Sequence, residues 1–236
     1  MTWRDFFNAD HSIYVNARHK ILHAQNIAKG VAAHIPSEDA IVLDYGCGEA
    51  LGARDVAKRC AKLYLYDSAP NVRAKLVAAA VGQPRIVVLD DDALDALPDS
   101  SLDMIAVVSV LQYVGDAELA RLLEVFRAKL KDDGVLVLGD IVPKNLSPVV
   151  DARELLAFGF RGGFLFAAGA GLVRTALSDY RVLREKFGLS TYDESDMREL
   201  LADHDFTCER ARDNIGHNQS RMTFRARKIG DARDCG

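Results

Sequence analysis

Apolar and polar residues recur along this chain with two different periods, and the periods predict strands and helices in turn. Short apolar runs predict buried strands at residues 40–45, 63–66, 85–89, 102–110 and 135–138. Apolar residues spaced three and four apart predict helices between them, at residues 16–34, 53–60, 72–80 and 116–130. Five alternating β/α units predict an α/β fold with a doubly wound, mostly parallel sheet.

The pattern changes after the fifth strand. Residues 143–190 are expected to be mostly helical and form a helical insertion, which we interpret as a substrate cover. A helix at 193–203 follows, and apolar runs at 206–211 and 222–228 predict an antiparallel pair that completes a seven-stranded sheet. We therefore expect a single domain over residues 1–236, with an N-terminal helical cap over 1–36.

Two connections are expected to lack regular structure. The sequence Lys-Asp-Asp-Gly at residues 131–134 predicts a turn before the fifth strand. Three consecutive aspartates, at residues 90–92, follow the third strand, and a loop is expected from there to residue 100.

Composition excludes several classes of protein. Hydrophobic residues make up 49% of the chain, which is enough for a large core, and the net charge of −4 gives no indication of a nucleic-acid partner. The four cysteines form no C-x-x-C pair, so neither a metal site nor a disulfide framework is predicted, and a reducing cytoplasmic location is expected. The most apolar stretch, 162–173, is shorter than the roughly 20 residues of a transmembrane helix.

A glycine-rich turn joins the first strand to the following helix. It begins Asp44-Tyr45-Gly46-Cys47-Gly48 and ends at Gly52, which gives the pattern D-x-G-x-G-x-x-x-G. Glycines let the backbone turn sharply and approach a ligand, and the helix that follows presents free N–H groups. A dinucleotide fingerprint would need glycine at position 51, where this chain has leucine. The alternative is an ordinary strand-to-helix turn.

The glycine pattern resembles the first motif of the class I S-adenosylmethionine (SAM)-dependent methyltransferases. The resemblance covers residues 40–140 motif by motif and the last two strands in outline. It implies SAM as cofactor, Cys47 within the cofactor-binding turn, and methyl transfer by in-line displacement to a small molecule with apolar or lipid-like character. The chain lacks Asn-Pro-Pro-Tyr after the fourth strand, which argues against planar nitrogen acceptors in nucleic acids or proteins.

Acidic residues follow the first two strands. Asp67 ends the second strand, about 20 residues after the glycines, where a carboxylate can accept hydrogen bonds from both ribose hydroxyls; Ser68 lies beside it. Asp44 is expected to organise the glycine turn, and the resemblance places it near the methionine ammonium group. The alternatives are a solvated loop acid for Asp67 and loop capping alone for Asp44.

The acids after the third strand are candidates to bind adenine. The family places an acid a few residues before Leu-Pro, and this chain has Leu97-Pro98, but its spacing is about one residue longer than usual. The choice between Asp91, Asp92 and the neighbouring backbone at Ala93 therefore stays open, with Asp92 favoured.

The fourth strand ends at another group of polar residues. Ser109 is expected to face the methionine part of the cofactor, because ligands bind at the carboxyl ends of such strands. Gln112 is a candidate for binding the cofactor and for lining the substrate pocket. Tyr113 can line the substrate pocket or simply pack on the next helix. Tyr14 and Arg18 lie four residues apart, so on a helix they would share a face and could contact the methionine carboxylate; the alternative is a solvent-facing cap.

The acceptor side is less defined by sequence. His217, in a polar segment between the last two strands, is a candidate general base, or part of a hairpin turn. The apolar stretch 158–173 suggests a pocket, a dimer face or peripheral membrane contact, so both monomer and homodimer are open. The alternative functions are a non-catalytic SAM-binding scaffold and another nucleotide-dependent enzyme.

Overall fold

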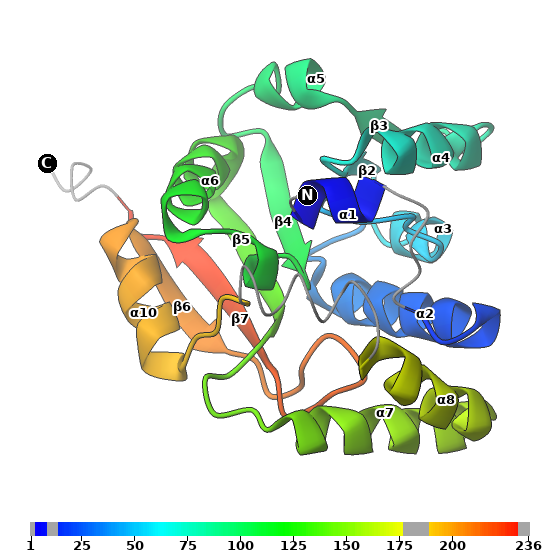
Figure 1. The fold of residues 1–236 in the computed structure, drawn as a ribbon. Helices are drawn as coiled ribbons and strands as arrows, with labels where there is room; N and C mark the ends of the chain where they lie inside the picture. The colour runs from blue at the N-terminus through cyan, green and yellow to red at the C-terminus, as the bar shows by residue number, and fades with distance from the viewer. Residues whose placement is uncertain (1–2, 9–13, 177–188, 231–236) are drawn as a thin grey trace, which may run out of the picture.

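A seven-stranded sheet runs through the computed structural model, which describes residues 3–8, 14–176 and 189–230 (Figure 1). Its strands are β1 (Ile41–Tyr45), β2 (Lys62–Tyr66), β3 (Ile86–Leu89), β4 (Leu102–Val108), β5 (Leu130–Ile141), β6 (Phe206–Arg210) and β7 (Met222–Lys228). They lie in the order β3-β2-β1-β4-β5-β7-β6. The first five are parallel, and β7 is antiparallel to both β5 and β6. The predicted fold class is confirmed.

Helices cover both faces of the sheet (Figure 1). One core is filled from α5 (Asp91–Asp95), α6 (Asp116–Lys129) and α10 (Glu194–Asp203). The opposite core is filled from α2 (Ala17–His34), α3 (Ala53–Ala57) and α4 (Pro70–Ala80). The central strand β4 shows the consequence: Ile105 packs in the first core and Met104 in the second, and both are fully buried. A strand covered on both faces reads as a continuous apolar run, as the sequence does here.

The prediction of a turn at 131–134, before the fifth strand, is wrong. These residues lie inside β5, where Leu102 pairs with Leu130 but Met104 pairs with Val135, so the ladder contains an irregular stretch. A Cβ on Gly134 would stand 2.9 Å from the carbonyl oxygen of Lys131, so glycine allows the chain to crowd there. The turn residues therefore form a bulge within a strand.

The predicted loop after β3 contains the short helix α5. Asp90 caps it, because its carboxylate accepts a hydrogen bond from the N–H of Ala93 at 2.8 Å. Asp91 and Asp92 then occupy the first turn, where negative charge favours a helix. The three consecutive aspartates at residues 90–92 thus form the N-terminal cap and first turn of α5.

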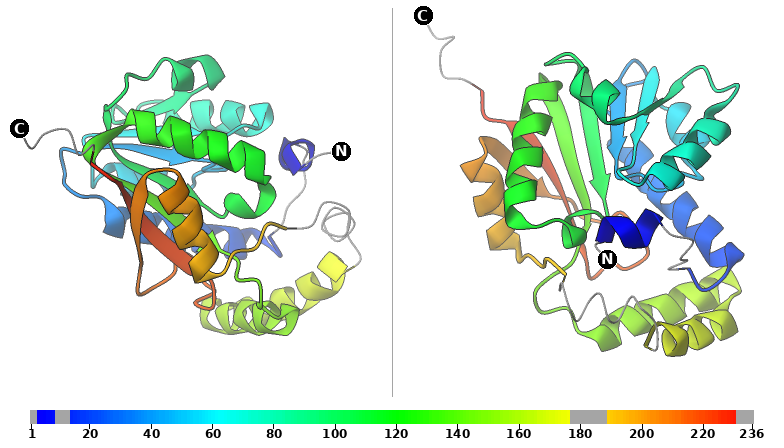
Figure 2. Two further views of the ribbon diagram at one scale, coloured as in Figure 1. Left: turned by 90° about the vertical axis from the view of Figure 1, so that its left-hand side faces the viewer. Right: turned by 45° about the horizontal axis from the view of Figure 1, so that its top comes forward.

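Three further helices lie near the carboxyl ends of the central strands (Figure 2). They are α1 (Trp3–Asn8), α7 (Pro148–Gly162) and α8 (Leu165–Ala176). The last two follow β5, as predicted for 143–190; the part at 177–188 lies outside the described residues. Asn8 at the end of α1 accepts a hydrogen bond from the N–H of Asn71 on α4 at 2.9 Å. No helix within the described ranges is both long and apolar enough to cross a membrane.

Candidate active site

The glycine turn is held against the ends of β2 and β4. The N–H groups of Gly46 and Cys47 both donate to the carbonyl of Tyr66, at 2.8 and 3.1 Å. Gly46 has φ +71°, and a Cβ there would stand 2.4 Å from Cγ2 of Val110, just beyond β4. Only glycine fits both the backbone conformation and the contact.

The other two glycines have different physical roles. Gly48 has φ +58°, and a Cβ on it would meet nothing within 4 Å, so this part of the turn borders open space. A Cβ on Gly52 would stand 2.4 Å from Cβ of Ala28 and 3.1 Å from the carbonyl oxygen of Ala24. The third glycine of the motif therefore allows α2 to pack closely, while the second faces the space in which a ligand can lie.

Asp67 ties the glycine turn to the end of β2. Its Oδ2 accepts from the N–H of Gly48 and its Oδ1 from the N–H of Ala69, each at 2.9 Å. Both carboxylate oxygens keep further acceptor capacity. Burial raises the pKa of Asp67, and the two backbone N–H groups oppose that rise. Ser68 is half-buried in the turn between these bonded residues.

The site is acidic around Asp44, near the end of β1. Burial, and then the negative charge of Asp67, raise the pKa of Asp44 to about 7. The pKa of the half-buried Cys47 thiol is raised as well, by burial first and then by Asp44. Two carboxylates that resist ionisation beside open space favour a cation in that space.

Of the two acids after β3 that are candidates to bind adenine, Asp91 is hydrogen-bonded within the chain, and Asp92 is exposed. Oδ1 of Asp91 accepts from the hydroxyl of Tyr66 at 2.6 Å, and Arg73 lies 3.4 Å from its Oδ2. Arg73 also donates to the carbonyl of Asp67 at 2.8 Å, so it bridges the ends of β2 and β3. Asp92 is exposed, and the Ala93 N–H is taken by the helix cap.

The carboxyl ends of β4 and β5 are joined by a polar contact. The hydroxyl of Ser109 donates to Oδ2 of Asp140 at 2.7 Å, and both residues have φ +60°. Such a conformation is uncommon outside glycine, and these two residues adopt it on neighbouring strands. Gln112 is buried and donates to the carbonyl of Ser109 at 3.2 Å. Tyr113 makes an edge contact with Phe7 of α1, at 5.0 Å between ring centroids.

Asp140 is the centre of a buried network that sequence reasoning missed. Its carboxylate receives Arg221 Nη1 at 2.8 Å and Asn214 Nδ2 at 3.1 Å. Arg221 also reaches Asp151 on α7 at 3.3 Å. Arg221 precedes a run of alternating apolar and basic residues, a pattern that suits the polar face of a strand. Its position just before β7 instead turns it toward two carboxylates. An acid at the end of a buried apolar run was the available signal for Asp140.

His217 lies within a group of aromatic rings beside that network. It stacks on Phe158 of α7 with centroids 4.9 Å apart and planes 14° apart. The rings of His23 and His19 on α2 lie 5.9 and 6.3 Å away. Burial, followed by the charge of His23, lowers the pKa of His217 to about 3, and burial lowers that of His19 to about 4. Near neutral pH these imidazoles are uncharged acceptors or donors.

The N-terminal candidates face this aromatic group. Tyr14 precedes the cap residue Asn16, so it does not share a helix face with Arg18 as the sequence predicted. The Tyr14 ring lies 5.4 Å from His19 and 5.6 Å from His23, while Nε of Arg18 donates to the carbonyl of Gly162. The glycine turn is reached from α2 by an ion pair of Lys20 with Glu49 at 2.5 Å.

The phenylalanines of the helical insertion separate into two sets. Phe158 and Phe164 are buried, and Phe164 stacks on His19 at 5.1 Å. Phe160 and Phe166 are 75% and 94% exposed. The insertion therefore presents one aromatic set to the site and another to its surroundings.

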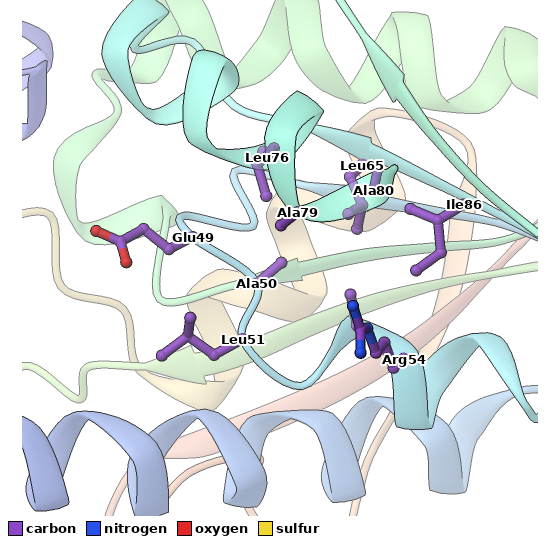
Figure 3. Close-up of a pocket in the computed structure, with 10 residues that line it drawn as sticks. Glu49, Ala50, Leu51, Arg54, Leu65, Leu76, Ala79, Ala80 and Ile86 are labelled. Atoms are coloured by element: carbon purple, nitrogen blue, oxygen red, sulfur yellow. The ribbon is translucent and has the colours of Figure 1, made fainter. Parts of the chain in front are cut away.

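A separate cavity of about 290 Å³ lies on the outer side of the glycine turn, between α3 and α4 (Figure 3). Leu51, Leu76 and Ile86 give it a mostly apolar lining, with Arg54 on one side. Neither Asp67 nor the residues after β4 line it. The described residues also contain no cluster of three or more histidine, cysteine or acidic side chains arranged to hold a metal ion.

Comparisons with known proteins identify a matching domain family and similar folds. Residues 43–138 match the methyltransferase domain family. A Haloferax volcanii chain, solved with the Trm112 methyltransferase activator, aligns over 98% of this chain and 99% of its own, with TM-score 0.62 and 15% identity. Magnesium protoporphyrin IX methyltransferase of Synechocystis PCC 6803 with bound S-adenosylhomocysteine (SAH) aligns over 96% and 92%, with TM-score 0.56 and 19% identity.

A third structure, the complex of DhpI with SAH, covers 88% of this chain and 85% of its own, with TM-score 0.56 and 14% identity. At these identities the structural likeness establishes the fold. No curated protein matches this chain by sequence.

Proposed function

We propose that this chain, a class I SAM-dependent methyltransferase, transfers the methyl group of SAM to a small-molecule acceptor with apolar character. The observation that carries the proposal is the glycine turn. Gly48 borders open space, and the carboxylate of Asp67 beside it is held by two backbone N–H groups with acceptor capacity remaining. This arrangement suits a ribose whose two hydroxyls donate to one carboxylate.

The remaining candidates fit the other parts of the cofactor. Asp44 suits the methionine ammonium group, since a half-buried carboxylate with a raised pKa gains from a nearby cation. The end of β3 suits adenine: Asp92 is exposed and available, whereas Asp91 is engaged by Tyr66 and Arg73. The other proposed contacts come from Cys47, Ser68, Ala93, Ser109 and Gln112.

When bound, SAM supplies a methyl group already activated by its sulfonium centre. The chain must then align the acceptor and exclude water, and orientation alone can supply several orders of magnitude in rate. The network at Asp140 fixes the ends of β4 and β5, and His217, Tyr113 and the helical insertion enclose the acceptor side. His217 is retained as a candidate base. Tyr14 and Arg18 act in this proposal by closing α2 against the insertion.

Calorimetric titration with SAM, beside NAD as a control ligand, tests the cofactor. We expect SAM to bind and NAD not to bind. Asp67→Ala should weaken SAM by at least tenfold, about 1.4 kcal/mol, because a charged acceptor is lost. Asp132→Ala is the matched control, since the Asp132 side chain is 99% exposed and lies on β5. Absence of SAM binding by the unaltered chain, or equal affinity in the two variants, would refute the site.

Methyl transfer separates the enzyme from a SAM-binding scaffold on the same fold. Labelled SAM is incubated with the full chain and extracts of lipids and small metabolites. Incorporation that disappears in Asp67→Ala supports transfer, whereas tight binding without incorporation supports the scaffold.

The exposed phenylalanines support a finer proposal about partners. Phe160 and Phe166 stand out from the insertion and can enter the interface of a lipid bilayer. Co-sedimentation with phosphatidylglycerol vesicles should be reduced in the double variant Phe160→Ser/Phe166→Ser. Equal sedimentation of variant and parent would remove the membrane contact.

A further inference from the structure

Two buried polar atoms beside the aromatic group have no partner in the described part of the chain. They are Nδ1 of His23, on α2, and Nε of Arg221, just before β7. Buried polar groups in folded proteins almost always have a partner, and an isolated one costs about 1–3 kcal/mol. Two such atoms at one place indicate that something supplied from outside the chain completes them.

The two atoms belong to the same local environment. Arg221 is hydrogen-bonded to Asp140, and both Arg221 and Asp140 act electrostatically on His23. Around His23 stand the rings of Tyr14, His19 and His217, with centroids 5.6, 6.0 and 5.9 Å away. The site thus combines one nitrogen that can accept a proton, one N–H that can donate, and aromatic surroundings.

We propose that this site holds the hydroxyl group of a planar aromatic acceptor, with His23, in place of His217, as the catalytic base and Arg221 as donor to the same oxygen. A hydroxyl is the simple group that donates one hydrogen bond and accepts another. Arg221 is already paired with Asp140 and Asp151, so its charge is compensated and a neutral acceptor is favoured over a carboxylate. The surrounding rings suit an aromatic partner, which gains from offset or edge contacts.

The position fits transfer from the proposed cofactor site. Asp140 is joined to Ser109, which follows β4, and Gly46 of the glycine turn packs beside Val110 on the same strand end. The cofactor therefore lies toward β1 and β2, and the acceptor toward β5 and β7. His23 is neutral near pH 7, because burial lowers its pKa and Asp140 only partly opposes this.

The reaction balances with no further reagent. The acceptor hydroxyl gives its proton to Nδ1 of His23, and its oxygen forms a bond to the methyl carbon. The bond between that carbon and the sulfonium sulfur breaks, and its electron pair stays on sulfur. His23 then releases the proton to solvent, so an aromatic alcohol and SAM yield a methyl ether, SAH and one proton.

The proposal rests on the proposed function, and binding of a probe separates the two. The probe is 2-naphthol, titrated into the full chain with and without SAH, while imidazole ¹⁵N resonances are followed by NMR. We expect 2-naphthol to shift the His23 resonance and to bind at least about tenfold more tightly than naphthalene, which lacks the hydroxyl. Failure of SAM binding alongside a His23 shift would remove the methyltransferase proposal and keep the hydroxyl site.

Variants distinguish a base from a structural histidine. His23→Asn keeps an amide oxygen that can accept the hydrogen bond but is not a base, so it should lower kcat for methylation of 2-naphthol by about 10²–10⁴-fold, with SAM affinity unchanged. His34→Asn, at the other end of α2, is the matched control and should change neither. Arg221→Lys keeps the positive charge but removes Nε, so it should reduce affinity for 2-naphthol more than affinity for naphthalene.

Three results would overturn the proposal. They are naphthalene binding as tightly as 2-naphthol, an unperturbed His23 resonance at saturating probe, and undiminished turnover by His23→Asn. Any of them would refute the assignment of His23 and Arg221 to one acceptor oxygen.

Discussion

Replacement of Gly46 by alanine separates two reasons for a glycine in the turn. At φ +71° a side chain costs about 1–2 kcal/mol in backbone strain. The new Cβ would also stand 2.4 Å from Cγ2 of Val110, and overpacking of this kind costs about 1–3 kcal/mol. We expect Gly46→Ala to lower the free energy of unfolding by about 2–5 kcal/mol, or Tm by about 4–20 °C for a chain of this size.

Gly48→Ala is the matched control. Its φ of +58° imposes a similar backbone cost, but its Cβ would meet nothing within 4 Å, so we expect a loss of about 1–2 kcal/mol. Urea denaturation of both variants gives the difference between them, which is the cost of the contact with Val110.

The double variant Gly46→Ala/Val110→Ala tests that contact directly. Val110→Ala removes Cγ2, so the two substitutions should be coupled by about 1–3 kcal/mol in the stabilising direction. Equal losses for the two glycine variants, or additive losses in the double variant, would refute the steric argument for Gly46.

Three further predictions concern charge and closure. Burial beside Asp67 raises the pKa of Asp44 to about 7, from a value near 4 in the unfolded chain. Between pH 4 and 7 the folded state therefore binds one more proton at Asp44, and this group makes the free energy of unfolding fall as pH rises. Asp44→Asn should therefore be more stable than the parent at pH 8, by about 1–4 kcal/mol, and nearly equal at pH 4 in urea denaturation. The pH dependence from His217 has the opposite sign. Its pKa is lowered to about 3 in the folded state, so the stability that is present above pH 6.5 is lost as pH falls. His217→Phe keeps a ring on Phe158 and should therefore lose less stability than the parent between pH 6.5 and 4.5. Arg18→Ala leaves the Gly162 carbonyl without its donor, and hydrogen exchange should show at least about fivefold faster exchange in α7, from a loss of about 1–3 kcal/mol, with the centre of β4 unchanged as the internal reference.

Local patterns in the sequence were sufficient to place the glycine turn and Asp67 at one edge of the sheet. Each strand from β1 to β3 is a continuous apolar run that ends at a polar residue, and parallel strands place those ends at one edge. Asp67 and the glycines could be found for that reason, and their contacts in the structure join neighbouring strand ends. Their roles toward SAM stay predictions until binding is measured.

The acceptor side depends on contacts between distant segments, which no local pattern encodes. His23 belongs to a helix whose apolar spacing says nothing of the insertion or of His217, although all three meet. Arg221 alternates with apolar neighbours as a surface residue would, yet it is buried by Asp140 and Asp151, 81 and 70 residues away in sequence. The environment of Arg221 thus depends on ion pairs with residues that only the tertiary fold brings near it.

The glycine turn and the group around His23, which lie at the carboxyl ends of different strands, differ in how their charges are compensated. Around the glycine turn, burial and the charge of Asp67 raise the pKa of Asp44, and burial raises the pKa of Asp67. Around His23, the charge of Arg221 is compensated by Asp140 and Asp151. A sulfonium is therefore attracted to the glycine turn more strongly than the neutral thioether left after transfer. In the proposed mechanism, the carboxylates that favour entry of the charged methyl donor therefore also favour departure of the neutral demethylated product.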